Sequence, residues 1–157
     1  MCVACQKSED RTQQKNESPE KLIVSSVSSD VTESVIETDR AVFSGNVTLQ
    51  GLRGSADLRA NDFWMETSRY VSSRKDHQFE NLKWLGQSVG AAVISDENTM
   101  SLGFGGVFNF QTDDDKIRPS DDRYLTTLIK VTDRSGEEVF FQTWTTVEIP
   151  WEIETGR

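Results

Sequence analysis

Cysteine and histidine are nearly absent from this chain. Its 157 residues include two cysteines, Cys2 and Cys5, and one histidine, His77. Disulfides therefore cannot brace the fold, and four-coordinate zinc would lack nitrogen and sulfur ligands beyond these three residues. The sequence also lacks a nucleophile elbow, a phosphate-binding glycine loop and a His-Glu-x-x-His motif. What remains as enzyme chemistry is a carboxylate-dependent hydrolase, which needs only two acidic side chains.

Positive charge and long apolar runs are scarce as well. The 26 acidic residues outnumber the 17 basic ones, which gives a net charge of −9 and a pI of about 4.6. This balance argues against a nucleic-acid partner, which requires a basic face. The densest basic cluster, Arg69 to Lys75, runs directly into Asp76 and is expected to be a solvated loop. No apolar run approaches the roughly 18 residues of a membrane span, so we expect membrane contact only through a lipid anchor.

The strongest positive signal is a hairpin near the C-terminus. Two runs rich in threonine, valine, isoleucine and aromatic residues, 123–132 and 137–149, flank the break Asp133-Arg-Ser-Gly136. This pattern predicts an antiparallel β-hairpin. In the second run the odd positions from Val139 to Ile149 form the expected core face, and the even positions, which include Trp144, form the more polar face.

A second strand is predicted for residues 100–110, where large and small residues alternate. Leu102, Phe104, Phe108 and Phe110 share one face, and Ser101, Gly103, Gly105 and Asn109 share the other. Glycines in a strand mark a bulge or the close approach of another group. We therefore expect the glycine face to lie against a second layer or to carry a bend.

The whole pattern predicts a mainly β protein, either an antiparallel β-sandwich or an open β-barrel of about seven to nine short strands. Residues 77–86 are open between one short helix and a strand, because Phe79, Leu82 and Leu85 repeat at three-residue spacing. Residues 1–20 are polar and are expected to form a disordered tail. Residues 21–157 form a single β-rich domain, of which 21–40 is either an integral part or a loosely attached arm.

Two short segments resemble known families. Val3-Ala4-Cys5, followed by a polar run, resembles the end of a bacterial lipoprotein signal, in which a small residue precedes a cysteine that becomes lipidated. The resemblance makes Cys5 a lipidation candidate and implies an exported protein of the cell envelope. Residues 42–61 resemble one repeat of the lipopolysaccharide-transport β-jellyroll proteins, in which a Gly-Asn-Val strand precedes a strand with Ala-Asp. No second copy occurs, so the likeness implies only strands there.

Acidic loop residues and aromatic residues supply the candidate sites. A weak calcium candidate consists of Asp113, Asp115, Asp121 and Asp122, because hard cations prefer several carboxylates. Solvated loop charge, partly balanced by neighbouring lysine and arginine residues, is the alternative. Trp144, Trp151 and Tyr124 are candidates for contact with a protein or carbohydrate partner, since exposed aromatic side chains commonly anchor such contacts.

Three functional hypotheses follow. The first is a noncatalytic β-sandwich-like binding or assembly module, tethered in the cell envelope if Cys5 is lipidated. The second is a virion or appendage structural protein, a homo-oligomer in which residues 1–40 form an arm that orders on a neighbouring subunit. The third is the carboxylate-dependent hydrolase.

Overall fold

The computed structural model describes residues 22–54, 63–73, 75, 82–95 and 98–153. These residues form nine β-strands and no helix. The strands are β1 (Ser26–Ile36), β2 (Arg40–Gln50), β3 (Trp64–Ser72), β4 (Lys83–Ala91), β5 (Val93–Ile94), β6 (Met100–Asn109), β7 (Tyr124–Thr132), β8 (Val139–Glu148) and β9 (Glu152–Ile153). The predicted mainly β class is confirmed. The segment left open between helix and strand is a strand from Lys83 onward, and residues 77–81 lie outside the described part.

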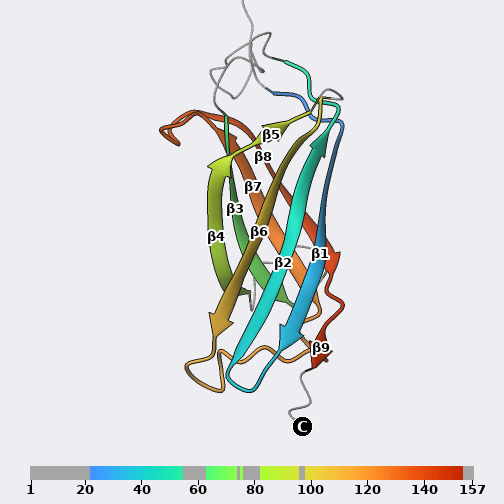
Figure 1. The fold of residues 1–157 in the computed structure, drawn as a ribbon, viewed down its shortest axis with the longest axis vertical. Coiled ribbons are helices and arrows are strands. Elements are labelled where there is room, and N and C mark those ends of the chain that lie inside the picture. The colour runs from blue at the N-terminus through green and yellow to red at the C-terminus, as the bar shows by residue number, and fades with distance from the viewer. Residues whose placement is uncertain (1–21, 55–62, 74, 76–81, 96–97, 154–157) are drawn as a thin grey trace, which may run out of the picture.

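The strands form two sheets that pack face to face (Figure 1). One has the order β5-β6-β2-β1-β9, and the other has the order β4-β3-β7-β8. All neighbouring strands are antiparallel except β1 and β9, which are parallel. At the two sides of the molecule β4 contacts β6 and β1 contacts β8, although neither pair forms a hydrogen-bonded ladder. The result is a β-sandwich with its two sheets drawn together at both edges.

The predicted C-terminal hairpin is β7 and β8. Its expected core face is confirmed from Phe141 to Ile149, but it is wrong at Val139 and Phe140. Leu125, Ile129 and Val131 are buried on β7, and their register partners on β8 are Val147, Thr143 and Phe141. A bulge opposite Val131 and Thr132 shifts the alternation at the start of β8. As a consequence, Phe140 also reaches the core.

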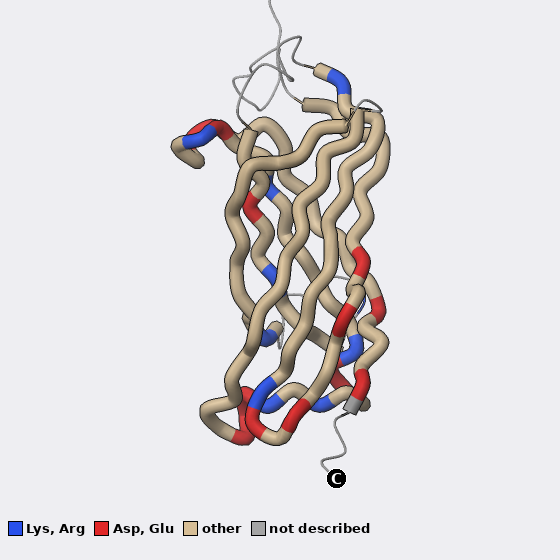
Figure 2. The backbone as a smooth tube through the Cα atoms, in the orientation of Figure 1, with Lys and Arg blue, Asp and Glu red and all other residues tan. Residues whose placement is uncertain are grey.

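The glycine-bearing strand β6 differs from its prediction in one respect. Its large side chains point inward as expected, with Met100 and Phe104 buried, but Gly103 and Gly105 are exposed, and no second layer of the described residues covers them. The side chains nearest to these glycines belong to the neighbouring strand β2. A Cβ atom would lie 3.4 Å from Asn46 Oδ1 at Gly103 and 3.4 Å from Ser44 Cβ at Gly105. These distances are at the limit of ordinary van der Waals contact, so the neighbouring strand leaves room for a Cβ atom at both positions. The middle of this sheet carries little charge, since β6 has no charged residue and β2 has only Arg40, whereas β1 beside them has Asp30 and Glu33 (Figure 2).

The core lies between the sheets and is built mainly from aliphatic residues with several aromatic ones. Its fully buried large side chains include Leu49, Met65, Met100, Ile117, Leu125 and Ile129. The strand β1 lies between β2 and β9, and the hydroxyl of Ser34 donates a 2.7 Å hydrogen bond to the carbonyl oxygen of Pro150. Residues 26–36 are thus an integral part of the domain. The predicted tail, residues 1–20, lies outside the described residues.

The expectation of a solvated basic loop at residues 69–75 is wrong for Arg69. It lies on β3 with 2% of its surface exposed and points between the sheets. The strand pattern explains the difference, because Met65, Thr67 and Val71 share the inner face with it. Arg69 therefore occupies a core position.

Candidate functional site

The outer face of the four-stranded sheet carries a row of aromatic side chains across three strands. Trp84 on β4 is opposite Tyr70 on β3, and Trp144 lies on β8 opposite Leu128 of β7. The rings of Tyr70 and Trp144 are tilted by 40° with centroids 6.1 Å apart. Trp84 is 56% exposed, although large apolar residues are usually more buried. We call the surface formed by Trp84, Tyr70 and Trp144 the aromatic face.

Sheet geometry places these side chains outward. Successive residues of a strand point to opposite faces of the sheet. The residues of β3 and β7 that point the other way, among them Thr67, Val71 and Thr127, are buried. A bulge at Leu85 in β4 keeps Trp84 in register with Tyr70 while Leu85 turns into the core. Tyr124 extends the aromatic face at the start of β7.

The charges on this sheet surface occur as neighbouring opposite pairs. Glu66 on β3 is the register partner of Lys130 on β7. At the end of the sheet, Arg123 Nη2 donates a 2.8 Å hydrogen bond to Glu148 Oε2. The hydrogen bond to Glu148 raises the pKa of Arg123, whose guanidinium also lies 6.0 Å from the ring of Tyr124. The surface around the aromatic face therefore has no strong charge of one sign.

A cleft of about 350 Å³ opens beside Trp84, between the start of β4 and the end of β6. Leu82, Lys83 and Trp84 line one side, and Phe108, Asn109, Gln111 and Asp115 line the other. The amide and carboxylate side chains at positions 109, 111 and 115 are exposed. The cleft thus combines an indole surface with hydrogen-bonding groups.

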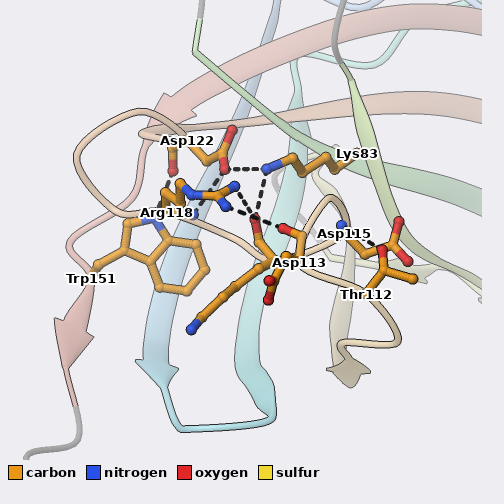
Figure 3. Close-up of polar contacts among 8 residues, drawn as sticks. Lys83, Thr112, Asp113, Asp115, Arg118, Asp122 and Trp151 are labelled. Atoms are coloured by element: carbon orange, nitrogen blue, oxygen red, sulfur yellow. Dashed lines mark hydrogen bonds and ion pairs between the residues drawn. The ribbon is translucent and has the colours of Figure 1, made fainter.

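The loop between β6 and β7 is held by a polar network around Asp122 (Figure 3). Lys83 Nζ donates hydrogen bonds of 2.7 Å to Asp122 Oδ2 and 2.7 Å to the carbonyl oxygen of Lys116. The backbone N–H of Arg118 donates to the same Asp122 oxygen at 2.9 Å. Asp122 is therefore engaged in fixing the loop to β4.

The residues of the calcium candidate lie in different environments. Asp113, Asp115 and Asp121 are exposed, whereas Asp122 is buried and paired with Lys83. Among the described residues no three His, Cys, Asp or Glu side chains are grouped so that they could hold a metal ion. The four aspartates are close in sequence, but the ion pair with Lys83 occupies the one buried carboxylate.

The three aromatic partner candidates occupy different environments. Trp144 and Tyr124 lie on the outer surface of the four-stranded sheet, as described above. Trp151 packs against the core, and its indole N–H donates a 2.8 Å hydrogen bond to the carbonyl oxygen of Asp122. Trp151 therefore anchors the end of the sandwich. Sequence reasoning did not place Tyr70 and Trp84 with Trp144, because only the registers of four paired strands, β4, β3, β7 and β8, bring them together.

The lipidation candidate Cys5 and the single histidine, His77, lie outside the described residues. In the part of the chain that the structure describes, no helix is long and apolar enough to cross a membrane.

Comparisons with known proteins give only weak similarities. No family model matches the chain. No curated protein matches it either. A solved structure described as Northeast Structural Genomics Consortium target SoR45 has 14% identity and a TM-score of 0.36, covering 84% of this chain and 89% of its own. A beta-glucosidase from Kluyveromyces marxianus has 11% identity and a TM-score of 0.34, covering 82% of this chain and 15% of its own. At these TM-scores neither structure bears on function.

Proposed function

We propose that this protein is a noncatalytic β-sandwich binding module that holds a neutral carbohydrate on its aromatic face. The observation that carries the proposal is the row of Trp84, Tyr70 and Trp144 across one sheet surface, with Trp84 more than half exposed. Pyranose rings have apolar C–H faces that pack on aromatic rings, and hydroxyl rims that require polar partners. Indole and phenol groups provide both an apolar body and a polar tip.

The surroundings of the aromatic face supply polar partners for sugar hydroxyl groups. Gln87, Ser68 and Thr146 occupy outward positions beside the rings. The cleft next to Trp84 adds the side chains of Asn109 and Gln111. Its volume of about 350 Å³ lies at the lower end of the usual range for small-molecule sites. A chain end or a side branch of an oligosaccharide fits a cleft of this size.

The charge distribution favours a neutral ligand. Glu66 is next to Lys130, and Glu148 is bound to Arg123, so the charges around the aromatic face are balanced locally. A polyanion would meet Glu66 and Glu148 as well as the cations, and the net charge of −9 would oppose its approach. A neutral polysaccharide avoids both costs.

Affinity electrophoresis in gels that contain neutral polysaccharides tests the proposal. A panel of glucans, mannans, xylans and soluble chitin oligomers covers the main classes of pyranose polymer. We expect at least one to retard the wild-type protein, and W84A to bind it at least tenfold more weakly, which corresponds to about 1.4 kcal/mol. The matched control is V93A, because Val93 is 66% exposed but lies on the other sheet.

The proposal fails if no member of the panel retards the wild-type protein. It also fails if W84A and V93A bind with equal affinity, because a contact through the aromatic face requires the indole of residue 84.

We also propose that a lipid on Cys5 tethers the protein to a membrane surface. The segment Val3-Ala4-Cys5 and the polar residues that follow it resemble a lipidated cysteine with a flexible spacer. Such a spacer would hold the sandwich away from a membrane surface of the cell envelope. Intact mass of the protein from its native source is the test: an acyl mass on Cys5 supports the tether, and an unmodified mass removes it.

A further inference from the structure

Arg69 is a buried cation between the two sheets. Its guanidinium carbon lies 4.9 Å from the ring centroid of Phe104 and 5.6 Å from that of Phe43, both on the opposite sheet. Burial lowers the pKa of Arg69 to about 10, so the group is still protonated at neutral pH. None of the ion pairs within the described residues involves it. A buried charge without a counterion is costly, so this arrangement requires an explanation.

The guanidinium uses only one side for hydrogen bonds to the described residues. Nη1 donates to Thr67 Oγ1 at 2.9 Å, to Ser88 Oγ at 3.0 Å and to the carbonyl oxygen of Thr67 at 3.4 Å. Within the part of the chain that the structure describes, the buried Nε has no hydrogen-bond partner. Nε and Nη2 form the other edge of the planar group, and this is an edge at which a carboxylate is bound through two parallel hydrogen bonds.

Gly86 keeps the Nη2 side of Arg69 open. It is the register partner of Arg69 at the bulge in β4 and has a φ of +145°. A Cβ atom at position 86 would lie 3.3 Å from Nη2, closer than an ordinary contact. The backbone of β4 therefore leaves space where a side chain would press against the guanidinium.

The position of this group in the sandwich gives a route of access. β4 is an edge strand, and it contacts β6 without a hydrogen-bonded ladder. Phe104 belongs to β6, so the guanidinium lies near the seam between the two sheets. A small molecule can enter such a seam by displacing side chains, without breaking backbone hydrogen bonds between strands.

We propose that the Nε and Nη2 edge of Arg69 binds a small monocarboxylate between the sheets. The carboxylate would accept hydrogen bonds from both nitrogens and supply the missing negative charge. Phe43 and Phe104 form apolar walls, which favour a short apolar acid over a multivalent, strongly hydrated anion. This site is separate from the aromatic face, so the proposal does not depend on carbohydrate binding.

Acetate is the probe for this site. Sodium acetate replaces sodium chloride at constant ionic strength while the Nε–Hε resonance of Arg69 is followed by NMR. We expect a saturable shift of that resonance. The melting temperature should rise by about 3–6 °C once acetate reaches tenfold its dissociation constant. No shift on exchange of chloride for acetate would overturn the proposal.

Two arginine-to-lysine variants separate this site from general salt effects. R69K keeps the charge but loses the planar edge, and its acetate response should disappear. The absence of one Nε–Hε resonance in R69K also assigns the Arg69 signal. R53K is the matched control, because Arg53 is exposed, and it should respond as the wild type does. An acetate response in R69K equal to that of the wild type would overturn the proposal; if R69K does not fold, the wild-type titration still decides it.

Discussion

Replacement of Asp122 tests whether the polar network is what holds the β6–β7 loop. The side chain of Asp122 is 7% exposed and that of Lys83 is 23% exposed, so both lie largely out of water. Asp122 Oδ2 accepts hydrogen bonds from Lys83 Nζ and from the backbone N–H of Arg118. D122A removes the acceptor for both donors and leaves the ammonium without its counterion.

The expected cost follows from these contacts. Removal of one partner from a fully buried ion pair costs about 3–5 kcal/mol. Lys83 keeps the hydrogen bond to the carbonyl oxygen of Lys116 and has some access to water, which reduces the penalty. We therefore expect D122A to lower the free energy of unfolding by about 2–3 kcal/mol. D122N keeps one acceptor oxygen and should cost about half as much.

Urea unfolding at neutral pH measures the effect. For an m-value of about 2 kcal/mol per molar urea, D122A should lower the transition midpoint by about 1–1.5 M with an unchanged m-value. D121A is the matched control: the neighbouring aspartate is exposed, and we expect a change within about 0.5 kcal/mol.

A double-mutant cycle with K83M isolates the pair. The coupling energy between residues 83 and 122 should exceed about 1 kcal/mol, because the two side chains are in direct contact. Two results would refute the conclusion that this network holds the β6–β7 loop in place. One is a urea midpoint for D122A equal to that of D121A, and the other is a coupling energy near zero.

Two further predictions concern glycine packing and pH. A Cβ atom at Gly45 would overlap the carbonyl oxygen of Asp30, so G45A should lower the free energy of unfolding by about 3 kcal/mol or more in chemical denaturation. G103A, at an exposed position, should change it by no more than about 1 kcal/mol. Equal losses in the two variants would contradict the packing around Gly45. The backbone N–H of Glu138 donates to Asp133 and holds the pKa of that carboxyl below its ordinary value of 3.8. Because the folded-state pKa is the lower one, ionised Asp133 stabilises the protein above about pH 3.8, and this contribution is lost as the pH falls through the folded-state pKa. Urea midpoints should therefore be higher for the wild type than for D133N at about pH 6, with a smaller difference at about pH 2.5; a constant difference would contradict it.

Local alternation in the sequence predicted several strands correctly. The hairpin of β7 and β8 and the inward side of β6 follow from a side-chain period of two, which depends only on neighbouring residues. The bulge that brings Phe140 into the core was not predictable in this way, because it depends on the pairing of one strand with another. The exposure of the glycine face of β6 likewise depends on tertiary packing, since no second layer of the described residues covers it.

The candidate sites depended much more on the tertiary structure. Arg69 sits in a cluster of charged residues, and its burial follows from its odd position on β3, which the sequence alone assigned to a loop. The ion pair of Lys83 with Asp122 joins residues 39 positions apart. Neither the composition nor the local pattern contains that pairing.

The sequence by itself determined a mainly β domain with a C-terminal hairpin and an acidic surface, because strand alternation, turn residues and net charge are local or additive properties. Only the tertiary structure decided which side chains meet. The register of β4, β3, β7 and β8 collects Trp84, Tyr70 and Trp144 on one surface, and the packing of the two sheets encloses Arg69. The physical reason is that strand register and sheet packing depend on the free energy of the whole folded chain, so no single segment determines them.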